Sequence, residues 1–176
     1  NFVIRWGSGV DPDDAESMLE AFERSWEVEI GELVHAPPPG ADTHKFNVYV
    51  GSTGGNTPSD YGAGGYFNTD DDGWPMIVLN SSTVSNPASG VTTVAHEFYH
   101  AIQFGTDTYG YADEAAWFWE ASASWVEVEV YPSNAAYTTF LFGFALLPYL
   151  ELNFFDYPDR GELQEYHQYG AFIWLR

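Results

Sequence analysis

The chain has 176 residues, and its content of 45% hydrophobic and 18% aromatic residues fits a globular domain with a real core and excludes a disordered chain. Asp and Glu number 26 against five Lys and Arg, and the resulting formal charge of −21 disfavours nucleic acid as a partner because it repels a phosphate backbone. The sequence has no apolar run long enough to predict a membrane span, and without cysteine any metal site must use nitrogen and oxygen ligands.

The two ends of the sequence favour a piece of a longer protein. The chain starts at Asn1 rather than at Met, and it stops at Arg176 inside a helical pattern that has no Gly or Pro stop signal. We therefore expect the core of a longer protein, whose further domains would be partners of this one.

The first ninety residues are predicted to be rich in strands. Residues 1–6 read as a short strand, and the carboxylates of residues 11–14 then open a helix whose apolar residues recur at helical spacing. A second strand is expected at 45–50.

Two further strands, at 64–68 and 76–80, are predicted to flank an acidic turn. The oxygens of residues 68–72 offer a calcium site, but the segment lacks EF-hand spacing, and a solvated β-turn fits it better.

The second half is predicted to be helical. One helix runs from Thr92 to Phe104 with Gly105 as its C-terminal cap, and Asp113 caps a second helix that ends near Val130. Residues 135–147 form a third apolar segment, and 161–176 form a last helix. The predicted fold class is α+β in one domain, with a strand-rich lobe at 1–90 and a helical lobe at 91–176.

The most informative motif is His96-Glu97-Phe98-Tyr99-His100, which has the pattern HExxH. Histidines four residues apart lie on one face of a helix, with Cβ atoms about 5–6 Å apart, so both rings can reach one ion. Glu97 lies about 100° round the helix from His96 and can act on a water held by that ion without being a ligand. Zinc lowers the pKa of such a water to about 7, so Glu97 can accept its proton. The alternative is a pair of histidines that bind no metal, but the helical pattern on both sides of the motif disfavours it.

A site of this kind needs a third protein ligand, and Glu120 is the strongest candidate. It lies in the run AWFWEASASW, where a buried carboxylate is costly unless it is paired or bound to a metal. Asp107, which follows the motif by seven residues, is the alternative ligand. Glu127 and Glu129 alternate with valines near the helix end, and we expect both to be solvated.

A glutamate separated from HExxH by nineteen residues resembles the pattern of gluzincin peptidases, such as thermolysin-like peptidases and M1-type aminopeptidases. The segments TVAHEFYHAIQ and WEASASW also resemble secreted, largely uncharacterised bacterial metallopeptidases, and the resemblance covers about residues 61–125. It implies a zincin-like fold, in which a twisted mixed sheet precedes a helical half that carries the metal site. It also implies one zinc ion per chain, a peptide or protein substrate, and a secreted or extracellular protein.

One position departs from the thermolysin-like pattern. Those enzymes carry an Asp four residues after the ligand Glu, where it supports a ligand histidine. This chain has Ser124 there, which can accept a hydrogen bond but carries no charge. The departure argues against close kinship with thermolysin and leaves Ser124 as the candidate support.

The resemblance also suggests where a substrate would bind. Gluzincins hold an extended peptide along an edge strand shortly before the HExxH helix, and here Gly65, Tyr66, Phe67 and Asn68 have that position. An ordinary strand with no role in binding fits these residues equally well.

An oxyanion donor is expected from a Tyr, His or Arg near the metal. His167 and Tyr169 in the last helix are the leading candidates, with Tyr166 beside them. Tyr111, nine residues before Glu120, matches the placement of a tyrosine that thermolysin-like enzymes use.

Two functions therefore compete. The first is zinc-dependent hydrolysis of peptide bonds by a water that Glu97 activates. The second is a zincin-fold binding or structural module of a larger extracellular assembly, which keeps the metal and lacks turnover. The intact HExxH motif favours the enzyme.

Overall fold

In the computed structural model of the protein, residues 1–107, 113–157 and 163–176 are described. The strands form one four-stranded sheet in the order β1-β2-β4-β3, from β1 (Phe2–Arg5), β2 (Phe46–Val50), β3 (Gly65–Thr69) and β4 (Pro75–Leu79). The pairs β1–β2 and β2–β4 are parallel, whereas β3 pairs antiparallel with β4 and forms one edge. All four strands were predicted, and a mixed sheet together with helices confirms the mixed α and β class.

The acidic turn between β3 and β4 is held by its own hydrogen bonds. The Asp70 carboxylate accepts from the N–H groups of Asp72 (3.0 Å) and Trp74 (2.9 Å), and Gly73 has a positive φ of 85° that favours glycine. Among the described residues, no group of three metal-ligating side chains gathers at this turn. These bonds give the Asp70 carboxylate a role in holding the turn.

Helix α1 (Pro12–Trp26) lies against the sheet with the apolar face that its sequence predicts. Asp11 is the N-cap, and its side chain accepts from the Asp13 N–H at 3.0 Å. The helix continues into a π-helix, η1 (Glu27–Glu32), a rare element that sequence periodicity did not predict.

Helix α3 (Pro87–Thr106) is longer than predicted and follows the short α2 (Ser81–Val84). It begins at Pro87 because proline suits the first turn of a helix, and not at Thr92. It ends at Asp107 in the left-handed conformation (φ 49°), so Gly105 is not the cap. Gly105 instead permits a close approach, since an added Cβ would lie 3.0 Å from Pro39 Cδ.

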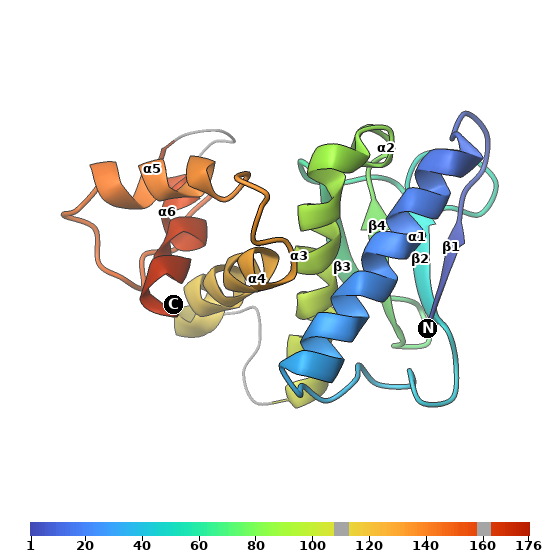
Figure 1. Ribbon diagram of the computed structural model, residues 1–176, viewed down its shortest axis with the longest axis horizontal. Helices are drawn as coiled ribbons and strands as arrows, with labels where there is room; N and C mark the ends of the chain where they lie inside the picture. Colours follow the sequence, from blue (N-terminus) through green and yellow to red (C-terminus); the bar gives the residue numbers. More distant parts are fainter. Residues whose placement is uncertain (108–112, 158–162) are drawn as a thin grey trace.

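The remaining helices form the other end of the molecule (Figure 1). A single 3-10 turn, η2 (Asp113–Ala115), precedes α4 (Ala116–Val130), so that Ala115 occupies the N-cap position predicted for Asp113. Helices α5 (Thr138–Leu146) and α6 (Glu165–Gly170) follow, and η3 (Ala171–Trp174) ends the structured part. Among the described residues, no helix combines the length and apolarity needed to cross a membrane.

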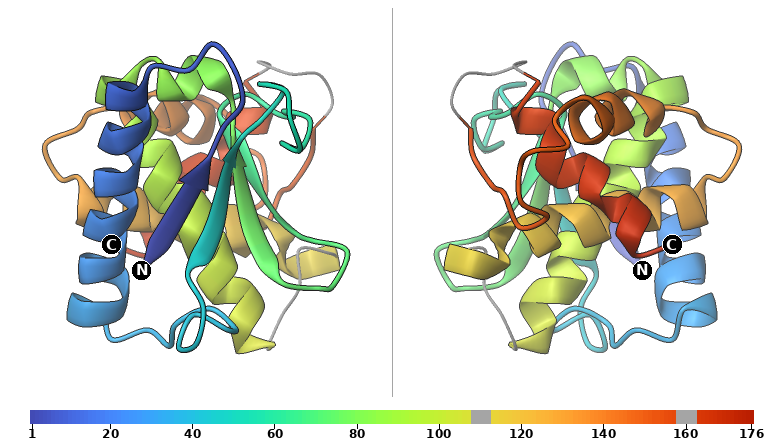
Figure 2. Two further views of the ribbon diagram at one scale, coloured as in Figure 1. Left: turned by 90° about the vertical axis from the view of Figure 1, so that its right-hand side faces the viewer. Right: turned by 90° about the vertical axis from the view of Figure 1, so that its left-hand side faces the viewer.

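Helix α3 lies between the sheet with α1 on one side and the helices α4 and α6 on the other (Figures 1 and 2). Aromatic rings fix it to the sheet: the ring of Phe2 lies 5.1 Å from Phe98 of α3, 5.0 Å from Phe22 of α1 and 5.8 Å from Phe46 of β2. Packing of this kind in a buried core holds the helix in one position. The HExxH residues are therefore carried by a helix that packs against other elements on both sides.

Candidate metal centre

Two crossing helices bring three ligand side chains together. His96 and His100 come from successive turns of α3, and Glu120 comes from the middle of α4. Their ligand atoms all lie within 4.8 Å of one another, and the three residues are only 4–8% exposed. The alternative ligand Asp107 is exposed at the end of α3 and does not belong to this group.

The spacing of these atoms fits a small tetrahedral ion. Glu120 Oε2 lies 3.0 Å from His96 Nε2 and 3.7 Å from His100 Nε2. Ligands about 2.0–2.1 Å from a tetrahedral zinc ion are about 3.4 Å apart, between these two values. Two imidazoles and one carboxylate also match the three-ligand sets of catalytic zinc sites, which keep a fourth position open. Calcium and magnesium prefer oxygen ligands.

The second ring nitrogen of each histidine, Nδ1, is hydrogen-bonded to a neighbouring side chain. His96 Nδ1 lies 2.7 Å from Glu127 Oε1, and His100 Nδ1 lies 2.6 Å from Gln103 Oε1. The Gln103 amide nitrogen donates to the Trp119 carbonyl (2.9 Å) and to Ser122 Oγ, which leaves its oxygen to accept from His100. Both Nδ1 atoms therefore carry hydrogen, and both Nε2 atoms present their lone pairs toward Glu120 when the rings are neutral.

The electrostatics of the cluster favour a cation. Burial alone would raise the pKa of the Glu120 carboxyl, but hydrogen bonds from His100 and His96 outweigh it and hold this pKa far below its usual range. Burial opposes protonation of His96, yet the carboxylates of Glu120 and Glu127 raise the pKa of His96 well above its usual value. Positive charge is thus stabilised at His96 Nε2, and either a proton or a metal ion can supply it.

Glu97 lies beside the cluster without belonging to the ligand group. Its side chain is 8% exposed, and burial raises the pKa of its carboxyl, an effect that His100 and His96 only partly offset. A raised pKa makes a carboxylate a better proton acceptor near neutral pH. The carboxylate also accepts a hydrogen bond from the Phe67 backbone N–H, which ties it to strand β3.

Strand β3 turns backbone groups toward its free edge. Asn80 N–H donates to the Gly64 carbonyl at one end of the hairpin, and Asp70 N–H donates to the Trp74 carbonyl at the other. Hydrogen bonding alternates along an antiparallel pair, so the N–H and C=O groups of Gly65 and Phe67 point away from β4. The predicted edge strand is confirmed, and its edge meets Glu97 at Phe67.

Of the predicted oxyanion donors that the structure describes, Tyr169 alone is brought to the histidines. Its ring lies 5.9 Å from the ring of His96. His167 is two residues earlier on α6 and so points to the opposite side of the helix, where it is buried between Phe144 (5.0 Å) and Phe154 (5.7 Å). The assignment of His167 as a catalytic residue is therefore wrong.

The other two candidate oxyanion donors are Tyr166 and Tyr111. The ring of Tyr166 lies 5.9 Å from that of Phe140, on the α5 side of α6. Tyr111 lies outside the described residues.

The support for His96 comes from Glu127 and not from Ser124. Glu127 is 5% exposed, contrary to the expectation of a solvated side chain, whereas the buried Ser124 hydroxyl has no hydrogen-bond partner. Burial raises the pKa of the Glu127 carboxyl, and its hydrogen bond with His96 partly offsets the rise. Residues four and seven positions after Glu120 share its face of the helix, so the spacing of Glu127 was a readable signal.

Tyr157 was missed altogether by the sequence analysis. Its hydroxyl donates to Glu120 Oε1 at 3.1 Å and lies 3.1 Å from the Tyr169 hydroxyl. It comes from the segment between α5 and α6, where no motif or periodicity points to it.

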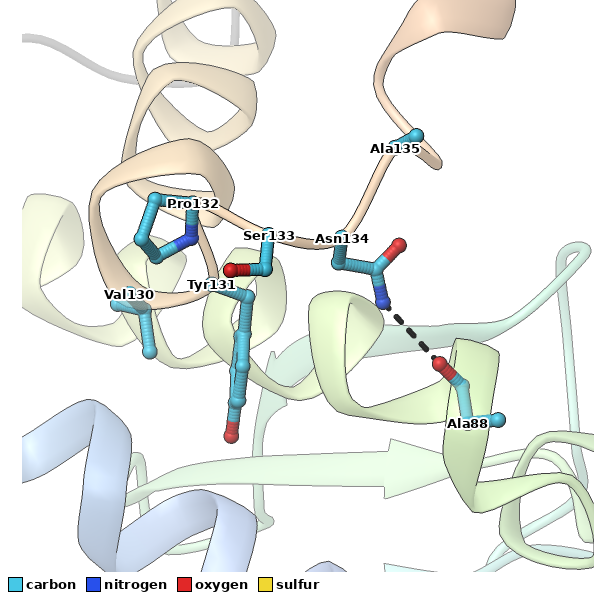
Figure 3. A pocket seen from close by; sticks show the side chains of 7 residues that line it. All are labelled: Ala88, Val130, Tyr131, Pro132, Ser133, Asn134 and Ala135. Carbon is cyan, nitrogen blue, oxygen red and sulfur yellow. Dashed lines mark hydrogen bonds between the residues drawn. The ribbon is translucent and has the colours of Figure 1, made fainter.

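Two surface hollows lie away from this cluster. The larger, of about 580 Å³, is formed by the α4–α5 connection over the start of α3 (Figure 3), and its lining is Ala88, Val130, Tyr131, Pro132, Ser133, Asn134 and Ala135. The polar contact drawn inside it joins Asn134 to the Ala88 carbonyl at 3.1 Å, and no charged side chain lines it. The smaller, of about 130 Å³, lies beside Trp74 and Lys45. Neither offers the converging reactive groups of the histidine cluster.

Comparisons with known proteins place the chain in a family without assigning it an activity. No curated protein and no solved structure matches it. Residues 1–175 match the profile of a family of unknown function, DUF6055. Since the match spans nearly the whole sequence, the chain belongs to the DUF6055 family.

Proposed function

We propose that this protein is a zinc-dependent peptidase with a zincin-like fold of the gluzincin type. The observation that carries the proposal is the convergence of two histidine Nε2 atoms and the Glu120 carboxylate, with both Nδ1 atoms held by Glu127 and Gln103. A histidine pair oriented by such partners is the arrangement of zinc sites in general. In the part of the chain that the structure describes, three protein ligands gather rather than four, which favours a catalytic ion over a structural one.

When bound, zinc would supply Lewis acidity, lowering the pKa of a water molecule and polarising a carbonyl. Glu97 would accept the proton of the attacking water, because its raised pKa suits a base and it stands outside the ligand group. The proton would then pass to the leaving amine. Tyr169, whose ring lies against His96, is the candidate donor to the developing oxyanion.

An extended peptide is the substrate that the surroundings of Glu97 favour. The outward backbone groups of Gly65 and the outward carbonyl of Phe67, whose N–H donates to Glu97, could pair with a peptide backbone and bring one of its carbonyls to the base. Glycine at 65 is required there, because an added Cβ would lie 2.8 Å from the Val78 carbonyl oxygen. Peptide hydrolysis, as opposed to that of another carbonyl compound, is supported by the resemblance to gluzincins.

The test is hydrolysis of casein by the zinc-loaded protein, with and without a chelator, in wild type and in Glu97→Gln. We expect the variant to keep its zinc and to lose hydrolysis by a factor on the order of 10²–10⁴, the usual contribution of a general base. Glu129→Gln is the matched control, since Glu129 lies on α4 but outside the ligand group.

Two outcomes would contradict the assignment. Equal loss of zinc and activity in Glu97→Gln would make Glu97 a ligand instead of a base. A wild-type chain that binds zinc and cleaves no unstructured protein would favour the binding or structural module.

A further inference from the structure

The two carboxylate oxygens of Glu120 have different partners. Oε2 faces the Nε2 atoms of His96 and His100, whereas Oε1 accepts a hydrogen bond from the Tyr157 hydroxyl at 3.1 Å. Glu120 is 4% exposed and Tyr157 is 42% exposed, so the hydrogen bond joins a buried carboxylate to a phenol that reaches the surface. Oε2 of Glu120 thus faces the proposed metal position, whereas Oε1 is hydrogen-bonded to the protein.

A second hydroxyl fixes the direction of this bond. The hydroxyls of Tyr157 and Tyr169 lie 3.1 Å apart. A carboxylate can only accept, so the single proton of Tyr157 goes to Glu120, and in the substrate-free chain its oxygen accepts from Tyr169, whose proton turns to an oxyanion only when substrate is bound. Tyr169 is itself held by stacking on Phe140, at 4.9 Å and 28°. Hydrogen bonds that run in one direction strengthen one another, which makes Tyr157 a firm donor.

We propose that Tyr157 is a positioning residue that keeps Glu120 bound to the metal through one oxygen, an inference that rests on the proposed zinc site. A carboxylate that bound through both oxygens would take two positions around the ion, so that with two histidines and a water the site would be five-coordinate instead of four-coordinate. With Oε1 held by Tyr157, Glu120 supplies one ligand atom. The fourth position is then left for the water that Glu97 is placed to deprotonate.

The rival is a purely structural role, in which Tyr157 anchors the segment between α5 and α6 to α4. Such a role would change stability but not the number of ligands around the ion. Visible absorption of the cobalt-substituted protein separates the two, because the d–d bands of Co²⁺ weaken when four-coordination becomes five-coordination.

The experiment compares wild type, Tyr157→Phe and Tyr149→Phe, each loaded with one Co²⁺ ion. Tyr149 is 74% exposed and serves as the matched control. We expect intense bands in wild type and in the control, and bands weaker by roughly twofold in Tyr157→Phe as Glu120 turns bidentate and the site becomes five-coordinate. A Tyr157→Phe protein that binds Co²⁺ with the wild-type spectrum would overturn the inference.

Two further outcomes keep the inference testable. A wild-type chain that takes up no Co²⁺ or Zn²⁺ would refute the proposed metal site itself, which is a different failure. If Tyr157→Phe does not fold, a crystal structure of the zinc-loaded wild type decides. Glu120 should bind through Oε2 alone with Oε1 still bonded to Tyr157, and a bidentate Glu120 or a displaced Tyr157 would refute the assignment.

Discussion

Replacing Glu127 by Gln should weaken zinc binding although Glu127 is not a ligand. Its carboxylate accepts from His96 Nδ1 at 2.7 Å, and both residues are buried. This bond fixes the ring so that Nε2 faces Glu120, and the negative charge makes Nε2 a stronger donor to a cation. The amide of Gln can still accept from Nδ1, but it carries no charge.

The expected loss is about 10- to 100-fold in zinc affinity, which corresponds to roughly 1.4–2.7 kcal/mol. Competition with a chromophoric zinc chelator measures it. Glu129→Gln is the control on the same helix, and Ser124→Ala should leave the affinity unchanged because the Ser124 hydroxyl has no hydrogen-bond partner. Wild-type affinity in Glu127→Gln together with weaker binding in Ser124→Ala would refute the reasoning and return the supporting role to Ser124.

Two more predictions concern stability and substrate binding. Glu29 is fully buried in η1 with neither carboxylate oxygen hydrogen-bonded, and burial raises its pKa well above the usual value, with His96 only partly offsetting the rise. Glu29 has a higher pKa in the folded chain than in the unfolded chain. At a pH between these two values the folded chain holds a proton that the unfolded chain has lost, so the free energy of unfolding should fall by about 1.4 kcal/mol for each unit by which the pH rises. In denaturant titrations from pH 4 upward, Glu29→Gln should therefore gain stability over wild type as the pH rises, unlike Glu20→Gln on the surface, and a constant difference would contradict this. Gly65→Ala should push β3 away from β4 and raise KM for a peptide while zinc content stays unchanged. The control is Gly31→Ala, because an added Cβ at Gly31 meets nothing within 4 Å. An unchanged KM in Gly65→Ala would show that β3 does not belong to the binding site.

Local patterns predicted the elements better than their ends. The strands and the helix α1 follow from short β-branched runs and helical spacing, and those signals were sufficient. The start of α3 was placed at Thr92 because residues 87–90 (PASG) carry no apolar periodicity, although Pro87 suits a first turn. The π-helix after Trp26 depends on how the end of α1 packs, which periodicity does not encode.

Some residues of the site could likewise be predicted from local sequence features, and others could not. The HExxH spacing and the apolar setting of Glu120 are local features, and the structure brings these three side chains together. The burial of Glu127 is not local: the alternation VEVEV suggests an exposed face, but α4 crosses α3 and turns this glutamate toward His96. Tyr157 ends a stretch, residues 154–157, that belongs to no helix or strand, so only the folded chain joins it to Glu120.

The central claim is that His96, His100 and Glu120 hold one zinc ion, and elemental analysis of the purified protein tests it most directly. Wild type purified without chelator, or reloaded and desalted, should contain about one zinc per chain, while the double variant His96→Ala/His100→Ala should contain none. No zinc in wild type after reloading would contradict the account, and so would undiminished zinc in the double variant.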